Sequence, residues 1–254
     1  MKHISRLLEH PLTRSLSVDD PRTTLLRREI IESKPFLRKI YLEWYRKIID
    51  ALPDGDHVLE LGSGAGFLDT LLPTLITSEV LEVPGISLCV DAQCMPFRDH
   101  SLDAVVMTDV FHHIPDVAAF LSEAQRCLRP GGKIVMIEPW RTRWSEWVYT
   151  NMHPEPFVPE GDWTIPESGP LSGANGALPW IVFSRDRSLF ESRYPGLRIN
   201  GIELLMPWSY LVSGGVSMRN LMPGSAYRAI RSIEGCLNQD DWAMFAFIEI
   251  EAVR

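Results

Sequence analysis

The stretch His57–Asp69, "HVLELGSGAGFLD", decides the fold. An apolar run that contains Glu60 leads into a turn with three glycines at alternate positions: Gly62, Gly64 and Gly66. Apolar residues from Phe67 to Leu75 then recur at helical spacing, although Pro73 shortens or kinks any helix there. A strand, a glycine turn and a helix in this order open many nucleotide-binding sites of α/β proteins.

Two kinds of cofactor use such a turn. A dinucleotide-binding turn, G-x-G-x-x-G, needs a glycine at position 67, where this chain has Phe67. A carboxylate from Glu60 would also repel a pyrophosphate, whereas it suits a ligand with an ammonium or sulfonium group. These residues favour a nucleoside cofactor without phosphates over a nicotinamide dinucleotide, and a solvated glutamate at a strand end stays the alternative.

Strands and helices alternate between residues 57 and 138, which predicts a parallel sheet covered on both faces. The expected strands are "HVLEL", "ITSEV", "SLCVDA", "LDAVVMTDV" and "KIVMIEP". A helix capped by Asp116 lies between the last two. Only residues 81–86 separate the second strand from the third, too few for a helical crossover. Either the usual helix is missing there or one strand is misread.

The remaining chain predicts a single domain over 1–254 with three parts. Residues 1–52 form an N-terminal helical cap broken at Pro35, and residues 53–139 form the cofactor-binding half. Residues 140–254 form an acceptor-side half. Its segment from His153 to Pro179 is rich in proline and glycine and predicts a long irregular loop beside a ligand site. Two further strands close the chain, "LRINGIELLMP" and "WAMFAFIEIEAV".

Composition narrows the class of partner. The net charge of −8 gives no general attraction to nucleic acid. Four scattered cysteines without a C-x-x-C pair predict neither a disulfide framework nor a zinc site, and no metal is expected. The chain starts without a signal-peptide core and has no apolar run long enough for an integral membrane segment. We expect a cytoplasmic location; the oligomeric state is not predicted.

Three motifs in order resemble the class I S-adenosylmethionine-dependent methyltransferases, specifically their small-molecule subgroup called type 11. They are "VLELGSGAG", "VDAQCMPFRDHSLDAVVMTDVFHHIPD" and "LRPGGKIVMIEP". The resemblance covers about His57 to Glu138. It implies a Rossmann-like α/β fold with a mostly parallel seven-stranded sheet, its last strand antiparallel, and helices on both faces. It also implies S-adenosyl-L-methionine as cofactor.

The resemblance implies roles for cofactor-binding residues. The three glycines would pass beneath the cofactor, and Glu60 would face the methionine ammonium directly or through water. A carboxylate after the second strand would hold the ribose; Glu79 is the candidate and Glu82 the competitor. Asp91 with the Ala92 backbone would meet the adenine amino edge. The remaining expectations are Thr108 near the methionine end, and Tyr41 or Phe36 as a cover for the adenine pocket.

The segment "DVFHHIPD" offers candidate catalytic groups where the fourth strand ends: Asp109, His112 and His113. A hydroxyl or amine acceptor must lose a proton, and histidine is the commonest base near neutral pH. The alternative to a catalytic role is structural: one of the histidines packs under the next helix and binds a carbonyl. His153 and Glu138 are weaker candidates.

The sequence thus predicts methyl transfer to an oxygen or nitrogen of a small-molecule or saccharide acceptor. A non-catalytic S-adenosylmethionine-binding regulatory partner subunit is the alternative, and a nicotinamide oxidoreductase is the third hypothesis. No Asn-Pro-Pro-aromatic motif follows the fourth strand, which argues against methylation of bases in nucleic acid.

Overall fold

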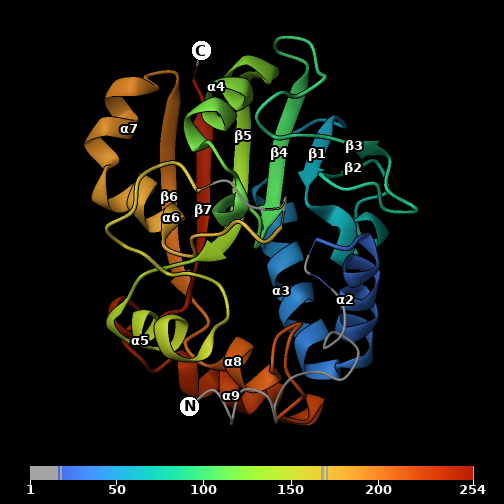
Figure 1. Ribbon diagram of the computed structural model, residues 1–254, viewed down its shortest axis with the longest axis vertical. Coiled ribbons are helices and arrows are strands. Elements are labelled where there is room, and N and C mark those ends of the chain that lie inside the picture. Colours follow the sequence, from blue (N-terminus) through green and yellow to red (C-terminus); the bar gives the residue numbers. More distant parts are fainter. Residues whose placement is uncertain (1–16, 18, 167–168, 170, 254) are drawn as a thin grey trace.

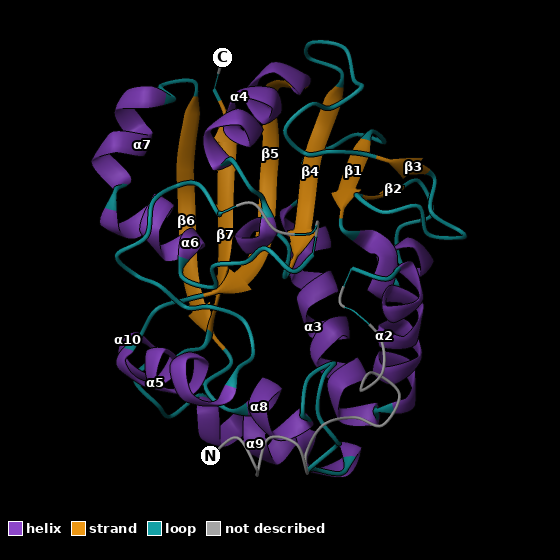
Figure 2. Ribbon diagram, viewed as in Figure 1, coloured by secondary structure: helices purple, strands orange, loops and turns teal. Residues whose placement is uncertain are grey.

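A seven-stranded sheet runs through the molecule in the order β3-β2-β1-β4-β5-β7-β6. The computed structural model describes residues 17, 19–166, 169 and 171–253. The strands are β1 (Val58–Leu61), β2 (Ile76–Glu79), β3 (Leu88–Cys89), β4 (Leu102–Thr108), β5 (Leu128–Pro139), β6 (Leu197–Leu205) and β7 (Phe245–Ala252). Only β7 runs against its neighbours, β5 and β6, and the other pairs are parallel. The predicted sheet is confirmed (Figure 2).

The central strands are buried on both faces because helices cover each side. Along β4, Val105 and Met107 belong to one apolar cluster, whereas Ala104 and Val106 belong to the other. This alternation follows from the pleat, which points successive side chains to opposite faces. It explains why the fourth strand reads as a continuous apolar run.

Helices lie on both faces of the sheet, as predicted (Figure 1). One apolar cluster packs α4 (Val117–Cys127), α6 (Leu178–Trp180) and α7 (Arg187–Arg193) against the sheet, together with the π-helical turn Ile181–Arg185. The other involves α2 (Pro21–Ser33), α3 (Pro35–Ala51), α5 (Arg143–Met152) and α8 (Ser209–Ser213). The remaining elements are α9 (Tyr227–Glu234), α10 (Gln239–Trp242) and the 3₁₀ turn Gly224–Ala226.

The N-terminal cap consists of α2 and α3, which are separated at Pro35 as predicted. Pro35 begins α3, since its missing N–H costs nothing in the first helical turn. Lys34, between the two helices, is buried and its Nζ donates 2.7 Å to the Gly215 carbonyl and also to that of Met218. The predicted helical content of residues 1–16 lies outside the described residues.

The helix expected from Phe67 to Leu75 does not form, so this prediction was wrong. A short 3₁₀ turn, Leu68–Thr70, takes its place, and another, Ser63–Ala65, lies within the glycine turn itself. Pro73 lacks a backbone N–H for a longer helix, and β2 begins three residues later. Between β2 and β3, the described chain makes turns and no helix, so the missing-helix interpretation is the right one.

The segment from His153 to Ala177 contains no helix or strand in its described part. A single bridge between Asp116 and Thr164 attaches it to the start of α4. The loop is therefore irregular, as predicted. Within the described residues, no helix has the length and apolar character that crossing a membrane requires.

Candidate functional site

Two cavities meet at the edge of the sheet where the parallel strands β1, β2 and β4 end. Their volumes are about 410 Å³ for the first cavity and about 80 Å³ for the second cavity. Four residues line both: Arg27, Asp109, His113 and Val216. Open α/β sheets bind ligands at this edge. The paired cavities are therefore the candidate site, with room for two ligands that meet at the shared residues.

Most residues predicted from the sequence lie in the wall of the first cavity. They are Gly62, Glu79, Asp91, Ala92, Thr108, Asp109 and His113. Four other predicted residues are outside this wall as the described residues form it: Glu60, Gly64, Gly66 and His112. The fold thus brings the ends of four strands to one cavity and leaves part of the glycine turn behind it.

The glycine turn is tightly packed against its surroundings. Gly62 has a φ of +70°, and a Cβ there would lie 2.4 Å from Val110 Cγ2. A Cβ on Gly64 would lie 2.3 Å from Thr24 Cγ2 and 2.9 Å from Glu79 Oε2. These positions need glycine because α2, β2 and the loop after β4 approach the turn so closely.

Glu60 lies behind the turn and is 4% exposed. Its backbone carbonyl accepts hydrogen bonds from the hydroxyls of Ser63 and Ser78. Burial raises the pKa of its carboxyl to about 7, and the nearby carboxylates of Asp69 and Glu79 act in the same direction. Gly66, the last glycine, lies against the Tyr45 hydroxyl. Because Glu60 lies behind the turn and outside the cavity wall, its position does not support a direct contact with a ligand in the cavity.

The two strand-end carboxylates differ in their surroundings. Glu79 is buried, and its Oε1 and Oε2 accept from the backbone N–H groups of Val80 at 3.0 Å and Gly64 at 3.3 Å. Glu82 is exposed and outside the cavity wall. Asp91 is exposed at the cavity rim, where its Oδ1 accepts from the Gln93 N–H at 2.8 Å.

Thr108 presents an unused hydrogen-bonding group to the first cavity. Its Oγ1 is buried and has no hydrogen-bond partner among the described residues. Leaving a buried hydroxyl without a partner costs about 1–3 kcal/mol. A polar ligand atom in the cavity would remove this cost.

Several lining residues had no signal in the sequence. Thr24 and Arg27 come from α2, whereas Leu171 and Val216 come from loops far along the chain. Arg27 has the only lysine or arginine side chain in either wall among the described residues. Tyr41, one of the two residues expected to cover the adenine pocket, lines the first cavity. The other, Phe36, is fully buried and packs at 5.2 Å against the ring of Tyr227.

A buried carboxylate shapes the loop that follows β4. Glu138 Oε1 accepts from the N–H groups of Val110 at 2.7 Å and Phe111 at 2.8 Å, and its Oε2 lies 2.8 Å from His112 Nδ1. Asp109, just before these groups, has a φ of +63°, uncommon for a residue other than glycine. Glu138 therefore holds the turn that directs Asp109 and His113 into the cavities.

Histidines gather around Glu155, which belongs to the irregular segment. Glu155 Oε2 lies 3.4 Å from His112 Nε2 and 3.8 Å from His153 Nδ1, and its Oε1 lies 3.9 Å from His113 Nε2. His113 Nδ1 is 2.8 Å from the carbonyl of Gly173, so it donates a hydrogen bond to that oxygen. Sequence spacing gave no sign of Glu155 or Gly173, because both arrive from the long loop.

Burial and neighbouring charges shift the pKa values of these groups in different directions. Burial raises the pKa of Asp109 to about 6. Burial together with the neighbouring charge of His112 lowers the pKa of His113 to about 4. Burial opposes a charge on His112, but Glu138 and Glu155 together raise its pKa well above the usual range. Likewise, burial would raise the pKa of Glu155, yet the surrounding histidines hold it well below its ordinary value.

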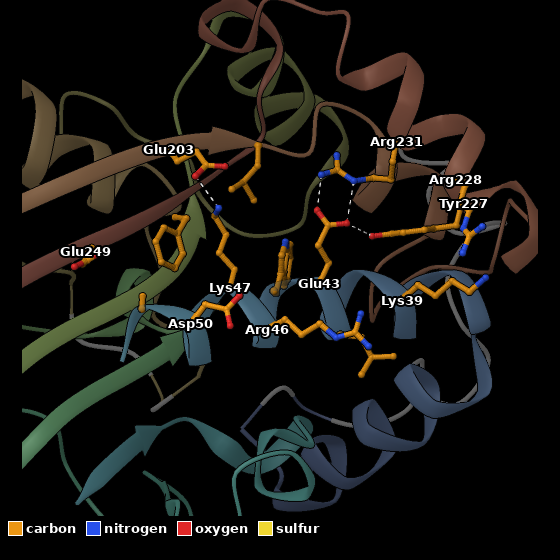
Figure 3. Close-up of a pocket in the computed structure, with 15 residues that line it drawn as sticks. Lys39, Glu43, Arg46, Lys47, Asp50, Glu203, Tyr227, Arg228, Arg231 and Glu249 are labelled. Atoms are coloured by element: carbon orange, nitrogen blue, oxygen red, sulfur yellow. Dashed lines mark hydrogen bonds and ion pairs between the residues drawn. The ribbon is translucent and has the colours of Figure 1, made fainter. Parts of the chain in front are cut away.

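A larger hollow lies elsewhere in the described chain, between α3, α9 and the strands β6 and β7 (Figure 3). It has a volume of about 780 Å³ and is open to solvent. Ion pairs hold some of its charged side chains: Glu43 with Arg231, and Lys47 with Glu203 at 2.6 Å. No residue predicted from the sequence lines it. We therefore place the candidate site in the two smaller cavities.

Comparisons with known proteins identify a domain in the chain. Residues 59–136 match the family described as a methyltransferase domain. The chain is 36% identical over 99 residues to a phthiotriol/phenolphthiotriol dimycocerosates methyltransferase of Mycobacterium ulcerans, covering 32% of this chain and 36% of that one. A fatty-acid O-methyltransferase of Mycolicibacterium smegmatis is 31% identical over 125 residues, with 42% and 41% of the two chains covered.

Solved structures share the fold. A geranyl diphosphate C-methyltransferase of Streptomyces coelicolor, solved with S-adenosyl-L-homocysteine, has a TM-score of 0.53 at 12% identity and covers 89% of this chain and 83% of its own. A methyltransferase of Thermotoga maritima, a possible histamine N-methyltransferase, has a TM-score of 0.53 at 17% identity, covering 84% and 89%. Residues 59–136 thus match a methyltransferase domain, and the relatives and structures named above are methyltransferases with the same fold.

The methyltransferase domain and the S-adenosyl-L-homocysteine bound in a neighbouring structure support S-adenosylmethionine as the cofactor. The first cavity fits this cofactor, since strand-end carboxylates and the unpartnered Thr108 hydroxyl offer acceptors and a donor for its polar groups. The chain spans only 36% and 41% of the length of the two curated relatives above.

Proposed function

We propose that this protein transfers a methyl group from S-adenosylmethionine to a small-molecule acceptor whose reacting atom enters the second cavity. One observation carries the proposal: the cofactor cavity and the second cavity share Asp109 and His113. The cofactor supplies a methyl group on a positively charged sulfur, which is already activated. The protein's main task is therefore to hold the two partners in line.

The cofactor-binding roles follow the cavity wall. Glu79 holds the ribose hydroxyls, supported by its position in the wall and by the exclusion of Glu82 from it. Asp91 and the Ala92 backbone meet the adenine amino edge at the rim. Thr108 contacts the methionine end with its unused hydroxyl. The glycine turn, with Glu60 behind it, supports the cofactor from below.

The second cavity favours an apolar acceptor. Its wall includes the side chains of Val148, Leu211, Met218 and Met244. Curated relatives are named for methylating a fatty acid, phthiotriol dimycocerosates and 2-methyl-6-phytyl-1,4-hydroquinone, which supports a lipid-like small molecule. At about 80 Å³, the cavity takes only the reacting end of such an acceptor, because one water already occupies about 30 Å³. A saccharide is the less favoured class.

Asp109, His112 and His113 have different parts in catalysis. Asp109 and His113 line both cavities, so either can contact the acceptor oxygen or nitrogen and take its proton. His112 is buried outside both walls, between Glu138 and Glu155, and orients the loop. A base at this place contributes about 10²–10⁴-fold to the rate.

The experiment combines binding and turnover. S-adenosylmethionine affinity is measured by calorimetry, and methyl transfer is assayed with fatty acids, hydroquinones and sugars as acceptors. His112→Gln and His113→Gln should bind the cofactor like the parent, and at least one should lose about 10²–10⁴-fold in rate. Cofactor binding without turnover on any acceptor class would favour the regulatory subunit instead. Parent rates in both variants would shift the base to Asp109.

Two expectations from composition stay predictions. They are the absence of a nucleic-acid partner and the cytoplasmic location. An acidic chain has little general affinity for nucleic acid, which supports the first.

A further inference from the structure

Three side-chain atoms converge beside the second cavity. They belong to His112, His113 and Glu155, one ligand atom from each, and lie within 4.8 Å of one another; the histidine atoms nearest Glu155 are the two Nε2 atoms. The histidines belong to the 3₁₀ turn Phe111–His113 after β4, whereas Glu155 belongs to the segment after α5. Two histidines and one carboxylate from separate parts of the chain therefore face a common point.

The opposite nitrogen of each ring is already engaged. His112 Nδ1 lies 2.8 Å from Glu138 Oε2, and His113 Nδ1 lies 2.8 Å from the Gly173 carbonyl. Both partners can only accept, so each Nδ1 carries a proton and is the donor. The Nε2 atoms of both rings are therefore the ones left to bind an ion beside Glu155, where a metal would displace any proton that His112 Nε2 carries. Metal-binding histidines almost always donate their other N–H to a carboxylate or a backbone carbonyl in this way.

Negative charge gathers at this cluster. Three carboxylates act on one another here, those of Asp109, Glu138 and Glu155. Arg27 lines the second cavity, but within the described chain none of the three carboxylates forms an ion pair with a lysine or arginine. A proton on His112 Nε2 offsets part of this charge, and a divalent ion in its place would neutralise more of it.

We propose that His112 Nε2, His113 Nε2 and the Glu155 carboxylate bind a divalent transition-metal ion of the zinc class. Two imidazoles and one carboxylate suit zinc and its neighbours, not magnesium or calcium. At metal–ligand distances of about 2.0–2.1 Å, tetrahedral ligands lie about 3.3 Å apart. The 3.4 Å separation of His112 Nε2 from Glu155 Oε2 meets this. His113 Nε2 lies 3.9 Å from the other oxygen, Oε1, so a small side-chain movement would bring both histidines and one Glu155 oxygen to a common ion.

An ion held by these residues would lie beside the second cavity, which His113 and Glu155 line. A metal there would hold an acceptor hydroxyl and make its proton easier to lose. This role rests on the proposed methyl transfer, whereas binding of the metal does not. Because the metal uses both Nε2 lone pairs, neither histidine is then free as a base, and Asp109 is the carboxylate left beside the acceptor.

Cobalt absorption tests the site without any acceptor. Protein stripped with a chelator is titrated with Co²⁺, and Zn²⁺ and Mg²⁺ are added in competition. The expected result is a visible band that saturates at one equivalent, disappears with Zn²⁺ and persists with Mg²⁺. Mass spectrometry of the metal content gives an independent stoichiometry. No band, or one that Mg²⁺ removes equally well, overturns the proposal.

Variants assign the ligands. Loss of an outer hydrogen-bond partner already costs about 10–100-fold in metal affinity, so His113→Gln and Glu155→Gln should each weaken Co²⁺ binding by at least about 100-fold. His57→Gln, a change of an exposed histidine, should bind Co²⁺ like the parent. Circular dichroism and S-adenosylmethionine calorimetry verify folding, and Glu155→Gln, the more exposed position, remains decisive if His113→Gln does not fold. Parent-like Co²⁺ affinity in a folded Glu155→Gln variant would overturn the assignment.

Discussion

Gly64 shows how one residue can control the cofactor cavity without touching it. A Cβ at this position would lie 2.3 Å from Thr24 Cγ2 and 2.9 Å from Glu79 Oε2. Both neighbours line the first cavity. A side chain on Gly64 therefore displaces wall residues instead of blocking the ligand directly.

Gly64→Val should weaken S-adenosylmethionine binding by at least tenfold and destabilise the fold by about 1–3 kcal/mol, the usual cost of overpacking. Calorimetry and chemical denaturation measure the two effects. Gly201→Ala is the matched control, because a Cβ at Gly201 on β6 meets nothing within 4 Å. Unchanged cofactor affinity in Gly64→Val would show that the wall does not depend on this contact.

Glu79 and Glu82 give a second comparison of single residues. Glu79→Gln removes the charge from a buried acceptor in the wall. It should weaken the binding free energy of S-adenosylmethionine by about 1.5–3 kcal/mol, which raises the dissociation constant roughly 10–150-fold. Glu82→Gln changes an exposed residue and should bind like the parent. The reverse ranking in calorimetry would move the ribose contact to Glu82.

At the scale of elements, the connection between the helical cap and the loop 214–218 is made by Lys34. Its Nζ donates to the carbonyls of Gly215 and Met218, and that loop lines the second cavity. Burial lowers the pKa of Lys34 to about 8, from an ordinary value of 10.5. The unfolded chain therefore holds more protons than the folded one between these two pH values.

Stability should rise with pH between about 8 and 10.5 through this lysine, since the state that binds more protons loses ground as pH increases. Lys34→Met should lack that part of the rise. Lys39→Met, a change of an exposed lysine on α3, should keep it. Urea denaturation at several pH values measures the slope, and equal slopes in the parent and Lys34→Met would contradict the account.

Elements with strong local patterns could be predicted from the sequence, and those set by packing could not. The strands β1, β4, β5 and β7 follow from apolar runs, and the break at Pro35 follows from its missing N–H. The apolar spacing after Gly66 predicted a helix, but close packing of the turn and Pro73 leave only the 3₁₀ turn Leu68–Thr70 there. The periodic spacing of apolar residues does not reveal such close packing.

The whole molecule assembles its site from distant segments. Strand ends supply the residues that motifs predict, such as Asp91 and Thr108. Arg27, Leu171 and Val216 also line the first cavity, although they come from the N-terminal cap and two late loops. Likewise, Glu155 meets the His112–His113 pair only through the folding of an irregular loop. No local pattern marks these residues, because their roles depend on contacts far apart in sequence.

Cofactor binding should therefore slow amide exchange in three separate places. We expect increased protection in α2 around residues 24–27, in residues 171–173 and in residues 214–218, since these segments meet over the cavities. Helix α9, beside the large open hollow, should exchange at the same rate with and without ligand. Hydrogen-exchange mass spectrometry measures this. Protection confined to α9 would mean that the ligand binds in the hollow.

The central claim is that S-adenosylmethionine binds in the first cavity with its reactive end toward Asp109 and His113. A crystal structure with S-adenosylhomocysteine tests it most directly. The account predicts density for the ligand in the first cavity, with the ribose at Glu79 and the sulfur toward the residues shared with the second cavity. Ligand density in the hollow between α3 and α9, or in the first cavity with the ribose away from Glu79, would contradict it.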